Sequence, residues 1–220
     1  KSLQVVANKI YNFGEFEPDG NYYVTAESKG KKNGLSWTDA MSVSDMVGML
    51  EKAKTNDVVM AIVNDATFHI AAGEHELADA VVELNYDEAE PVVLTFKGGY
   101  ADDGSRDLEN SQTAFSGNEK HGILNITGGV DVTFDGIAFI KSKTAAEKSC
   151  ALMCQGTTTG VTLLNCKFTD NENTADVDGA GVGGLMVGYV IDGVAGNIGV
   201  CGQSANTQRE DCNQNQCQCD

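Results

Sequence analysis

A segment of this chain repeats itself after about thirty residues, and this repeat limits what the chain can fold into. Residues 132–139 align with residues 161–168, and residues 123–128 align with 151–156 at nearly the same offset. Each copy contains short apolar strands separated by Gly, Asn and Asp, with no room for a helix between them. Such a period is typical of stacked repeats, which bury their inward side chains against the next copy.

The repeat predicts an all-β fold, a right-handed parallel β-helix (solenoid) with one N-terminal capping α-helix. The helix is expected near residues 44–54, where Val43, Met46 and Leu50 recur at helical spacing. Ser44 is the expected N-cap, and Asp45 suits the positive end of the helix dipole. A helix ahead of the stacked strands would shield the first of them from water.

Further strands are expected from runs of β-branched and aromatic residues. They are residues 22–25, 58–70 with a corner at Asn64 and Asp65, 91–96, 113–118 and a strand pair at 185–191. The acidic residues 71–91 show little periodicity and are interpreted as an insertion. The chain is thus divided into an extended lead-in at 1–21, a β-helix domain at 22–192 and a cysteine-rich tail at 193–220.

The formal charge of −17, from 32 acidic and 15 basic side chains, argues against two classes of partner. Nucleic acids and anionic membrane surfaces both need clustered Lys and Arg, so we expect neither. No apolar run approaches the roughly 18 residues of a membrane-spanning helix. An acidic surface is instead typical of a soluble protein in a salty exterior medium.

None of the seven cysteines precedes Cys150. Cys154 and Cys166 fall at positions that hold isoleucine in the previous repeat, so we expect both to be core thiols. The disulfide candidates are Cys201, Cys212, Cys217 and Cys219. Disulfides in this polar tail would imply an oxidising, extracellular setting, and zinc is the alternative although the spacing differs from common zinc sites. The odd count leaves one thiol free or paired between chains.

Several short motifs resemble those of a known group of proteins. They are Tyr22-Tyr23-Val24, Asn33-Gly34-x-Ser36-Trp37-x-x-Ala40, Asp57-Val58-Val59, Gly98-Gly99-Tyr100, Arg106-Asp107, residues 113–117, Phe168-Thr169-Asp170-Asn171 and Gly183-Gly184-Leu185. The first three are similar to the N-terminal start of right-handed parallel β-helix proteins of the pectate-lyase-like superfamily, which are common on bacterial surfaces, and the next three resemble the continuation in the same group. The last two resemble the FxxN and GGA-type repeats of polymorphic outer-membrane proteins. The resemblance covers residues 22–190 and implies a fold and a surface location, with no particular activity.

Patterns for catalysis are weak. A polysaccharide lyase needs a Lys or Arg base and a cation that holds the substrate carboxylate. The candidate bases in the repeats are Lys141, Lys143, Lys148 and Lys167. The acids Asp131 and Asp135 have no counterpart in the next repeat, and acids are too abundant to single out the facing pair of a glycoside hydrolase. The three histidines, His69, His75 and His121, lie far apart in the sequence and are interpreted as structural.

One acidic loop is a candidate metal site. Residues 170–179 are dense in oxygen ligands and resemble a calcium loop, although they do not fit the EF-hand pattern. The candidate ligands are Asp170, Glu172, Asp176 and Asp178. Calcium is thus the one cofactor considered, and a solvated turn is the alternative.

Together these patterns favour a secreted or cell-surface, non-enzymatic protein with a structural or adhesive role. End-to-end self-assembly into extracellular fibres is a further expectation, because a short stack of strands has two open ends. The expected interactions are self-association and contacts with glycans or a neighbouring surface. The alternative function is a carbohydrate-active enzyme, a polysaccharide lyase or glycoside hydrolase, on the same scaffold.

Overall fold

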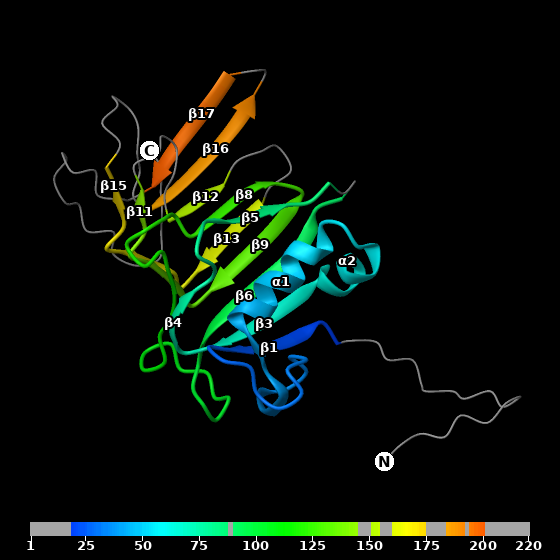
Figure 1. Ribbon diagram of the computed structural model, residues 1–220. Helices are drawn as coiled ribbons and strands as arrows, with labels where there is room; N and C mark the ends of the chain where they lie inside the picture. The colour runs from blue at the N-terminus through cyan, green and yellow to red at the C-terminus, as the bar shows by residue number, and fades with distance from the viewer. Residues whose placement is uncertain are drawn as a thin grey trace, which may run out of the picture.

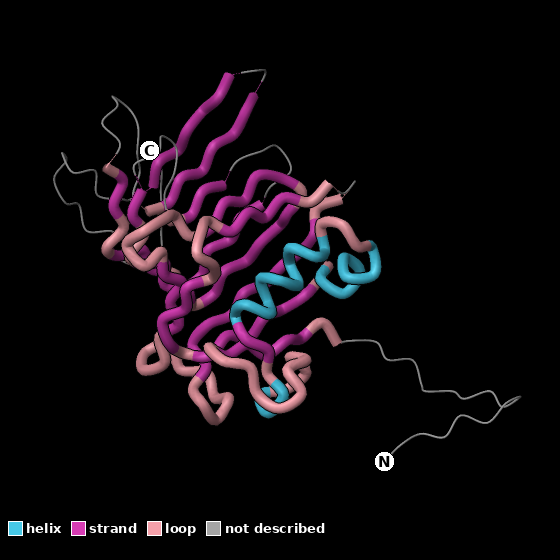
Figure 2. Tube along the Cα trace, in the orientation of Figure 1, coloured by secondary structure: helices cyan, strands magenta, loops and turns pink. Residues whose placement is uncertain are grey.

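The computed structural model describes residues 19–87, 90–144, 151–154, 160–174, 184–191 and 194–200. The helices are η1 (Trp37–Asp39), α1 (Val43–Ala53) and α2 (Asp57–Val63). A six-stranded sheet has the order β13 (Gly160–Leu164), β9 (Val130–Asp135), β6 (Val92–Tyr100), β3 (Ala66–Ala71), β1 (Asn21–Thr25) and β2 (Met41–Ser42). In Figures 1 and 2 α1 and α2 lie together beside these strands.

Three further sheets complete the described structure. The five-stranded sheet has the order β17 (Val194–Val200), β16 (Leu185–Ile191), β12 (Leu152–Cys154), β8 (Leu124–Gly128) and β5 (Val82–Asn85). The four-stranded sheet has the order β14 (Lys167–Thr169), β10 (Ile137–Ile140), β7 (Thr113–Ser116) and β4 (Gly73–Glu76). Strands β11 (Lys143–Thr144) and β15 (Glu172–Asn173) form the two-stranded sheet. The ladders within all four sheets are parallel, apart from the antiparallel pair β16–β17.

The alignment of the two sequence repeats is confirmed as a pairing register. Val161 of β13 lies opposite Val132 of β9, and Phe168 of β14 lies opposite Phe139 of β10. In the five-stranded sheet, Leu152 of β12 lies opposite Leu124 of β8. Equivalent side chains therefore sit beside one another on neighbouring strands.

Inward side chains of the six-stranded sheet form a column of stacked rings. The ring centroids are 5.6 Å apart between Tyr22 and Phe68, 5.4 Å between Phe68 and Phe96, and 5.2 Å between Phe96 and Phe134. The four rings occupy equivalent positions on β1, β3, β6 and β9 because the strands pair in register. The four-stranded sheet closes on this column through Phe139, whose ring meets Phe134 edge-on at 5.2 Å. This column is the centre of the hydrophobic core.

The helix predicted near 44–54 is confirmed as α1, but its N-cap is Ser42 rather than Ser44. The Ser42 hydroxyl accepts a hydrogen bond from the Asp45 backbone N–H, and the Asp45 carboxylate accepts one from the Ser42 backbone N–H. This reciprocal capping box fixes the start of the helix at Val43, the first residue of the apolar stripe. The buried residues of that stripe are Val43, Met46, Leu50 and Ala53.

Two hydrogen bonds tie the C-terminal half of α1 to the five-stranded sheet. The Tyr86 hydroxyl donates to the Leu50 carbonyl at 3.2 Å, and the Lys54 ammonium donates to the Glu83 carbonyl on β5 at 2.7 Å. Since α1 also follows directly after β2, it spans from the six-stranded sheet to β5. Strands β1, β2 and β5 come early in the chain and lie at one end of their sheets, and α1 lies at that same end.

The predicted fold class is wrong. Instead of one all-β, right-handed parallel β-helix with a single capping helix, the described residues form a mixed α/β structure with four separate sheets and two α-helices. A second helix, α2, follows α1, and β17 turns back antiparallel to β16. The repeat carried information about which strands pair, whereas these departures lie outside the repeated residues.

Part of the strand predicted at 58–70 is helical. Residues Asp57–Val63 form α2, and the strand β3 begins only at Ala66. The Asn56 side chain accepts a hydrogen bond from the Val59 backbone N–H, and Asp57 adds a negative charge to the first turn. These two features favour a helix where the apolar run alone was ambiguous.

The insertion predicted at 71–91 is also wrong, because this segment supplies β4 and β5. In β5, buried Val82 and Leu84 alternate with exposed Glu83 and Asn85, which is the pattern of a half-buried strand. The expected 1–21 lead-in lies almost wholly outside the described residues, as does the tail after residue 200. Among the residues that the structure describes, no helix is long and apolar enough to cross a membrane.

The capping box can be tested with two serines that are neighbours in sequence. Replacing Ser42 with Ala is expected to lower the free energy of unfolding by about 1 kcal/mol, because the Asp45 N–H loses its acceptor. Replacing Ser44, which is exposed, should lower it by less than ~0.5 kcal/mol. Urea denaturation of both variants measures the difference, and equal losses would contradict the assignment of the cap.

The aromatic core can be tested at Phe134, the last ring of the column, and at Phe168 on the edge strand β14. Phe134→Ala is expected to lower the free energy of unfolding by about 3–5 kcal/mol, because its ring is fully buried and leaves a cavity. The Phe168 ring stacks on Phe139 at 4.9 Å but is only half-buried, so Phe168→Ala should cost clearly less. Urea denaturation again provides the comparison. A loss at Phe168 as large as that at Phe134 would show that β14 is as tightly covered as β9.

Candidate functional site

The outward face of the six-stranded sheet carries a row of identical side chains. Thr67, Thr95, Thr133 and Thr162 lie opposite one another on β3, β6, β9 and β13, and Asn21 continues the row on β1. The four threonines, called the threonine row below, are half-buried or exposed. Neighbouring strands lie about 4.8 Å apart, so the hydroxyl groups recur at that interval.

A second outward row lies two residues further along each strand. Its members are Tyr23, His69, Lys97, Asp135 and Leu164. The row changes from aromatic through cationic and anionic to apolar as it crosses the sheet. Within the described ranges, no ion pair involves Lys97. The two rows together, called the outward strip below, cross five neighbouring strands of the sheet.

One end of this strip is an aromatic cluster, made of Tyr23, Trp37, His69 and Tyr100. The Trp37 ring lies 5.1 Å from Tyr23 and 5.3 Å from Tyr100, and Tyr23 stacks on His69 at 5.2 Å. Gly104 closes one side, because a Cβ there would lie 2.8 Å from the Trp37 ring and its φ of +83° suits glycine. All four rings are half-buried, so each keeps some surface towards solvent.

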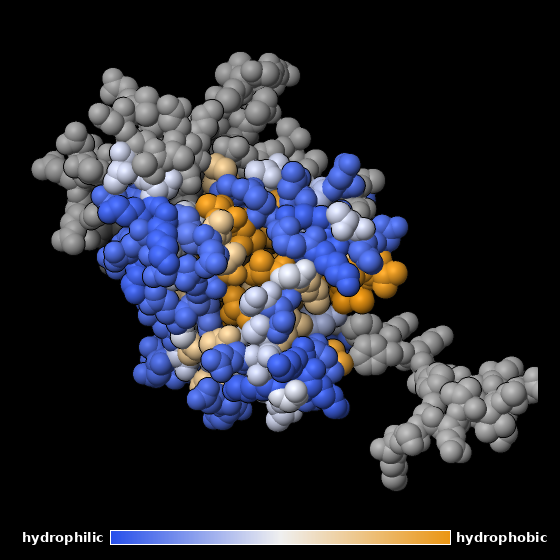
Figure 3. All heavy atoms as spheres, viewed as in Figure 1, coloured by the Kyte–Doolittle hydropathy of each residue, from blue (hydrophilic) through white to orange (hydrophobic). Residues whose placement is uncertain are grey.

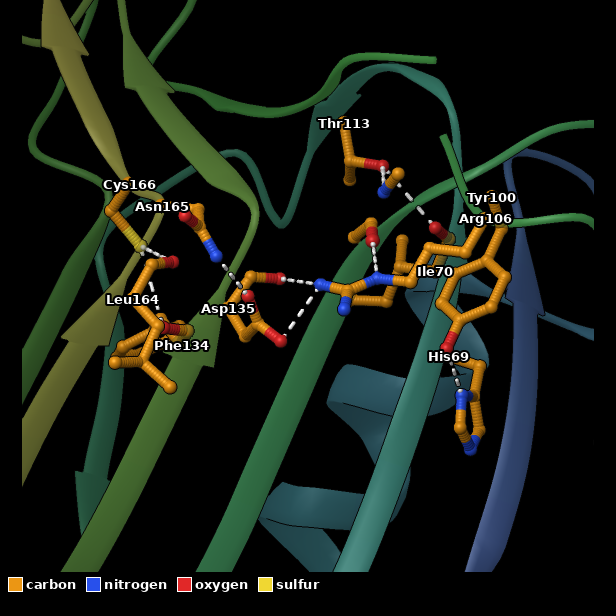
Figure 4. Close-up of polar contacts among 12 residues, drawn as sticks. His69, Ile70, Tyr100, Arg106, Thr113, Phe134, Asp135, Leu164, Asn165 and Cys166 are labelled. Carbon is orange, nitrogen blue, oxygen red and sulfur yellow. Dashed lines mark hydrogen bonds and ion pairs between the residues drawn. The ribbon is translucent and has the colours of Figure 1, made fainter. Parts of the chain in front are cut away.

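His69 is fixed in one neutral form by its two partners. Its Nε2 lies 2.8 Å from the Asn21 side-chain oxygen, an acceptor, so Nε2 carries the proton. Its Nδ1 then accepts from the Tyr100 hydroxyl at 2.7 Å, as Figure 4 shows. Burial lowers the pKa of His69, and the nearby charges of Lys97 and Arg106 lower it further. The ring therefore orients Tyr100 without carrying a charge.

An ion pair connects the aromatic cluster to the far strands of the sheet. The Arg106 guanidinium contacts the Asp135 carboxylate at 2.8 Å, and its Nε donates to the Gly98 carbonyl at 2.9 Å (Figure 4). The Asn165 amide donates to the same carboxylate at 3.0 Å. Burial alone raises the pKa of Asp135, but the hydrogen bonds from Arg106 and Asn165 outweigh it and lower the pKa. Arg106 also lies over the Tyr100 ring at 5.8 Å, so the loop that carries it is held against the strip.

The two predicted core thiols differ in burial. Cys154 is buried opposite Ile126, in agreement with the prediction. Cys166 is half-buried and donates weakly to the carbonyls of Phe134 and Leu164. Burial raises the pKa of the Cys166 thiol, which keeps it protonated at neutral pH. The disulfide candidates Cys201, Cys212, Cys217 and Cys219 lie outside the described residues.

The predicted calcium loop is described only in part. Asp170 is exposed with a φ of +55°, and Glu172 forms an ion pair with Lys143 at 3.0 Å. The other two candidate ligands, Asp176 and Asp178, lie outside the described residues. In the part of the chain that the structure describes, no group of three or more His, Cys, Asp or Glu side chains could hold a metal ion.

Two of the candidate bases of a lyase are paired with carboxylates. Lys141 contacts the Glu74 carboxylate at 2.7 Å, and Lys143 contacts Glu172. Lys167 is exposed on β14, and Lys148 is outside the described residues. The other two histidines bond to backbone carbonyls, His75 to Ala71 and His121 to Gly122. Tyr23, Trp37, Tyr100 and Arg106 all belong to the motifs quoted from the sequence, but those motifs were interpreted as features of the fold. Their meeting with His69 was not predicted, because the five residues come from separate loops and strands.

Stability should depend on pH through His69. The unfolded chain binds a proton at His69 near the ordinary pKa of 6.5, whereas the folded protein resists protonation because its pKa is lowered. Folding is therefore expected to lose stability as the pH falls through and below that value. Urea denaturation at about pH 7.5 and 5.5 should show a smaller loss in His69→Gln than in the parent protein, at pH values above the titration of ordinary carboxylates. An equal pH dependence in both proteins would contradict this assignment.

Comparisons of the chain with protein-family models, with curated proteins and with solved structures found no match. The resemblance to the pectate-lyase-like superfamily, drawn from short motifs, therefore stays an untested prediction. What the outward strip can bind must be argued from its own geometry and chemistry.

Proposed function

We propose that the protein is a non-enzymatic, secreted or cell-surface module with a structural or adhesive role, whose contact surface is the outward strip of the six-stranded sheet. The observation that carries the proposal is the threonine row, held in register beside the aromatic cluster. Side chains on adjacent strands are fixed relative to one another, so the strip is preorganised for a ligand with a repeating structure.

The chemistry of the strip suits a neutral glycan. Threonine hydroxyls can both donate to and accept from sugar hydroxyls, and the half-exposed rings offer apolar surface to the C–H faces of a sugar. The formal charge of −17 opposes the approach of a polyanion. A neutral polysaccharide on a cell or matrix surface is therefore the proposed ligand class.

The proposal includes self-association. Fibres that grow end to end need two open ends, but α1 lies at one end of the sheets and is bonded to β5 through Lys54. The end of the sheets away from α1 can still meet the same end of a second copy of the chain while α1 stays in place. Such an arrangement closes on itself and stops at two chains.

Glycan binding can be tested by removing single hydroxyl groups. A panel of neutral polysaccharides is first screened by affinity electrophoresis of the full chain. For a polysaccharide that retards the protein, Thr95→Val and Thr133→Val should each weaken binding by about 0.5–1.5 kcal/mol, roughly 2- to 10-fold, because each loses hydrogen bonds while keeping its shape.

The control is Thr169→Val, which removes an exposed hydroxyl from β14 of another sheet and should leave binding unchanged. Failure of every neutral polysaccharide to retard the protein would overturn the proposed ligand class. Release of reducing ends or of unsaturated sugars during the assay would instead indicate the carbohydrate-active enzyme.

A further inference from the structure

The last strand of the six-stranded sheet is less covered than the strand before it. Val132 and Phe134 of β9 are 2% and 0% exposed, whereas their partners Val161 and Leu163 on β13 are only half-buried. The neighbouring Leu164 is 48% exposed. Because the residues are equally apolar, the difference reflects position: β9 has a strand on both sides, and β13 pairs with β9 alone among the described strands.

The edge of β13 lacks the features that protect other edges of the sheets. At the α1 end, β2 is two residues long, β4 carries Glu74 and Glu76, and the Glu83 carbonyl of β5 is occupied by Lys54. Short edges, edge charges and covering groups all discourage pairing with another chain. Strand β13, Gly160–Leu164, contains no charged residue at all.

We propose that two copies of this chain pair through their β13 edges, antiparallel and about a two-fold axis. The inference makes the proposed self-association specific. Thr162 lies at the centre of β13, so it would face Thr162 of the second copy, and Val161 would face Leu163. On a chain with a charge of −17, an uncharged edge is where two copies can meet without opposing carboxylates.

Pairing of this kind satisfies several groups at once. The backbone groups of β13 that face away from β9 gain partners, and the half-buried Val161 and Leu163 gain an apolar neighbour. The outward strip continues across the junction, so the threonine row of one copy runs into that of the other. A two-fold axis uses the same edge on both copies, and the assembly is a closed dimer rather than a fibre.

The molecular mass of the full chain in solution shows whether a second copy occupies the β13 edge. Sedimentation velocity over a concentration series, with a reductant present to exclude disulfide links, should show a reversible monomer–dimer equilibrium. Thr162→Lys and Thr162→Glu place like charges opposite each other, and each should weaken dimerisation at least about tenfold. An equimolar mixture of the two variants should restore the dimer, because lysine then faces glutamate.

The matched control is Val93→Lys, which adds the same charge to an exposed outward position on β6, a strand with a neighbour on both sides. It should dimerise as the parent protein does. A parent chain that stays monomeric, as when another segment of the chain covers β13, would overturn the proposal. So would a Thr162→Lys variant that dimerises normally, or a mixture that does not recover. Glycan retardation of the parent chain is measured separately, so loss of the dimer and loss of the proposed ligand class can be told apart.

Discussion

The structure depends on parallel strand pairing in which equivalent residues lie opposite one another. Because side chains alternate across a strand, this register stacks one set of residues inward and a second set outward. Inside, it places Tyr22, Phe68, Phe96 and Phe134 in a single column of rings with centroid separations between 5.2 and 5.6 Å. A slip of one residue on any of these strands would turn its ring to the solvent side. The pairing register of the strands and the packing of the core therefore depend on each other.

The outward strip is the other consequence of that constraint. The threonine row is regular because the backbone spacing of the sheet is regular, and no contact between the threonines is needed to produce it. The aromatic cluster and the Arg106–Asp135 ion pair lie at the ends of the strands, where loops of different lengths meet. The strip thus combines a repeating part, set by the sheet, with a local part, set by loops. In the view of Figure 3, hydrophobic side chains gather in the middle of the visible face and at its right margin, and hydrophilic ones cover its left and lower parts.

The two ends of the sheets differ in how their edge strands are covered. At one end α1 buries four apolar residues and donates through Lys54 to a β5 carbonyl. At the other end β13 offers an uncharged edge with half-buried valine and leucine side chains. This asymmetry separates a closed pair of chains from the fibre expected from the sequence, since a fibre would need an accepting edge at both ends. It also explains why Phe139 and Phe168, which occupy equivalent positions in successive repeats, differ in burial.

The sequence by itself determined the strand pairing within the repeats, the helix at α1 and the burial of Cys154, because each depends on local periodicity or on a match between two segments. The sequence placed the N-cap of α1 at the wrong serine and led to the wrong fold class. It also predicted a strand where α2 forms, because a short apolar run suits a helix or a strand until its flanking caps and neighbours are known. The threonines at 133 and 162 were aligned by the repeat, but Thr67 and Thr95 joined their row only in the folded sheet, since unequal loops separate the strands. The meeting of Trp37, His69, Tyr100 and Arg106 was decided by tertiary structure alone, because contacts among strands and loops that lie apart in sequence leave no periodic signal in the chain.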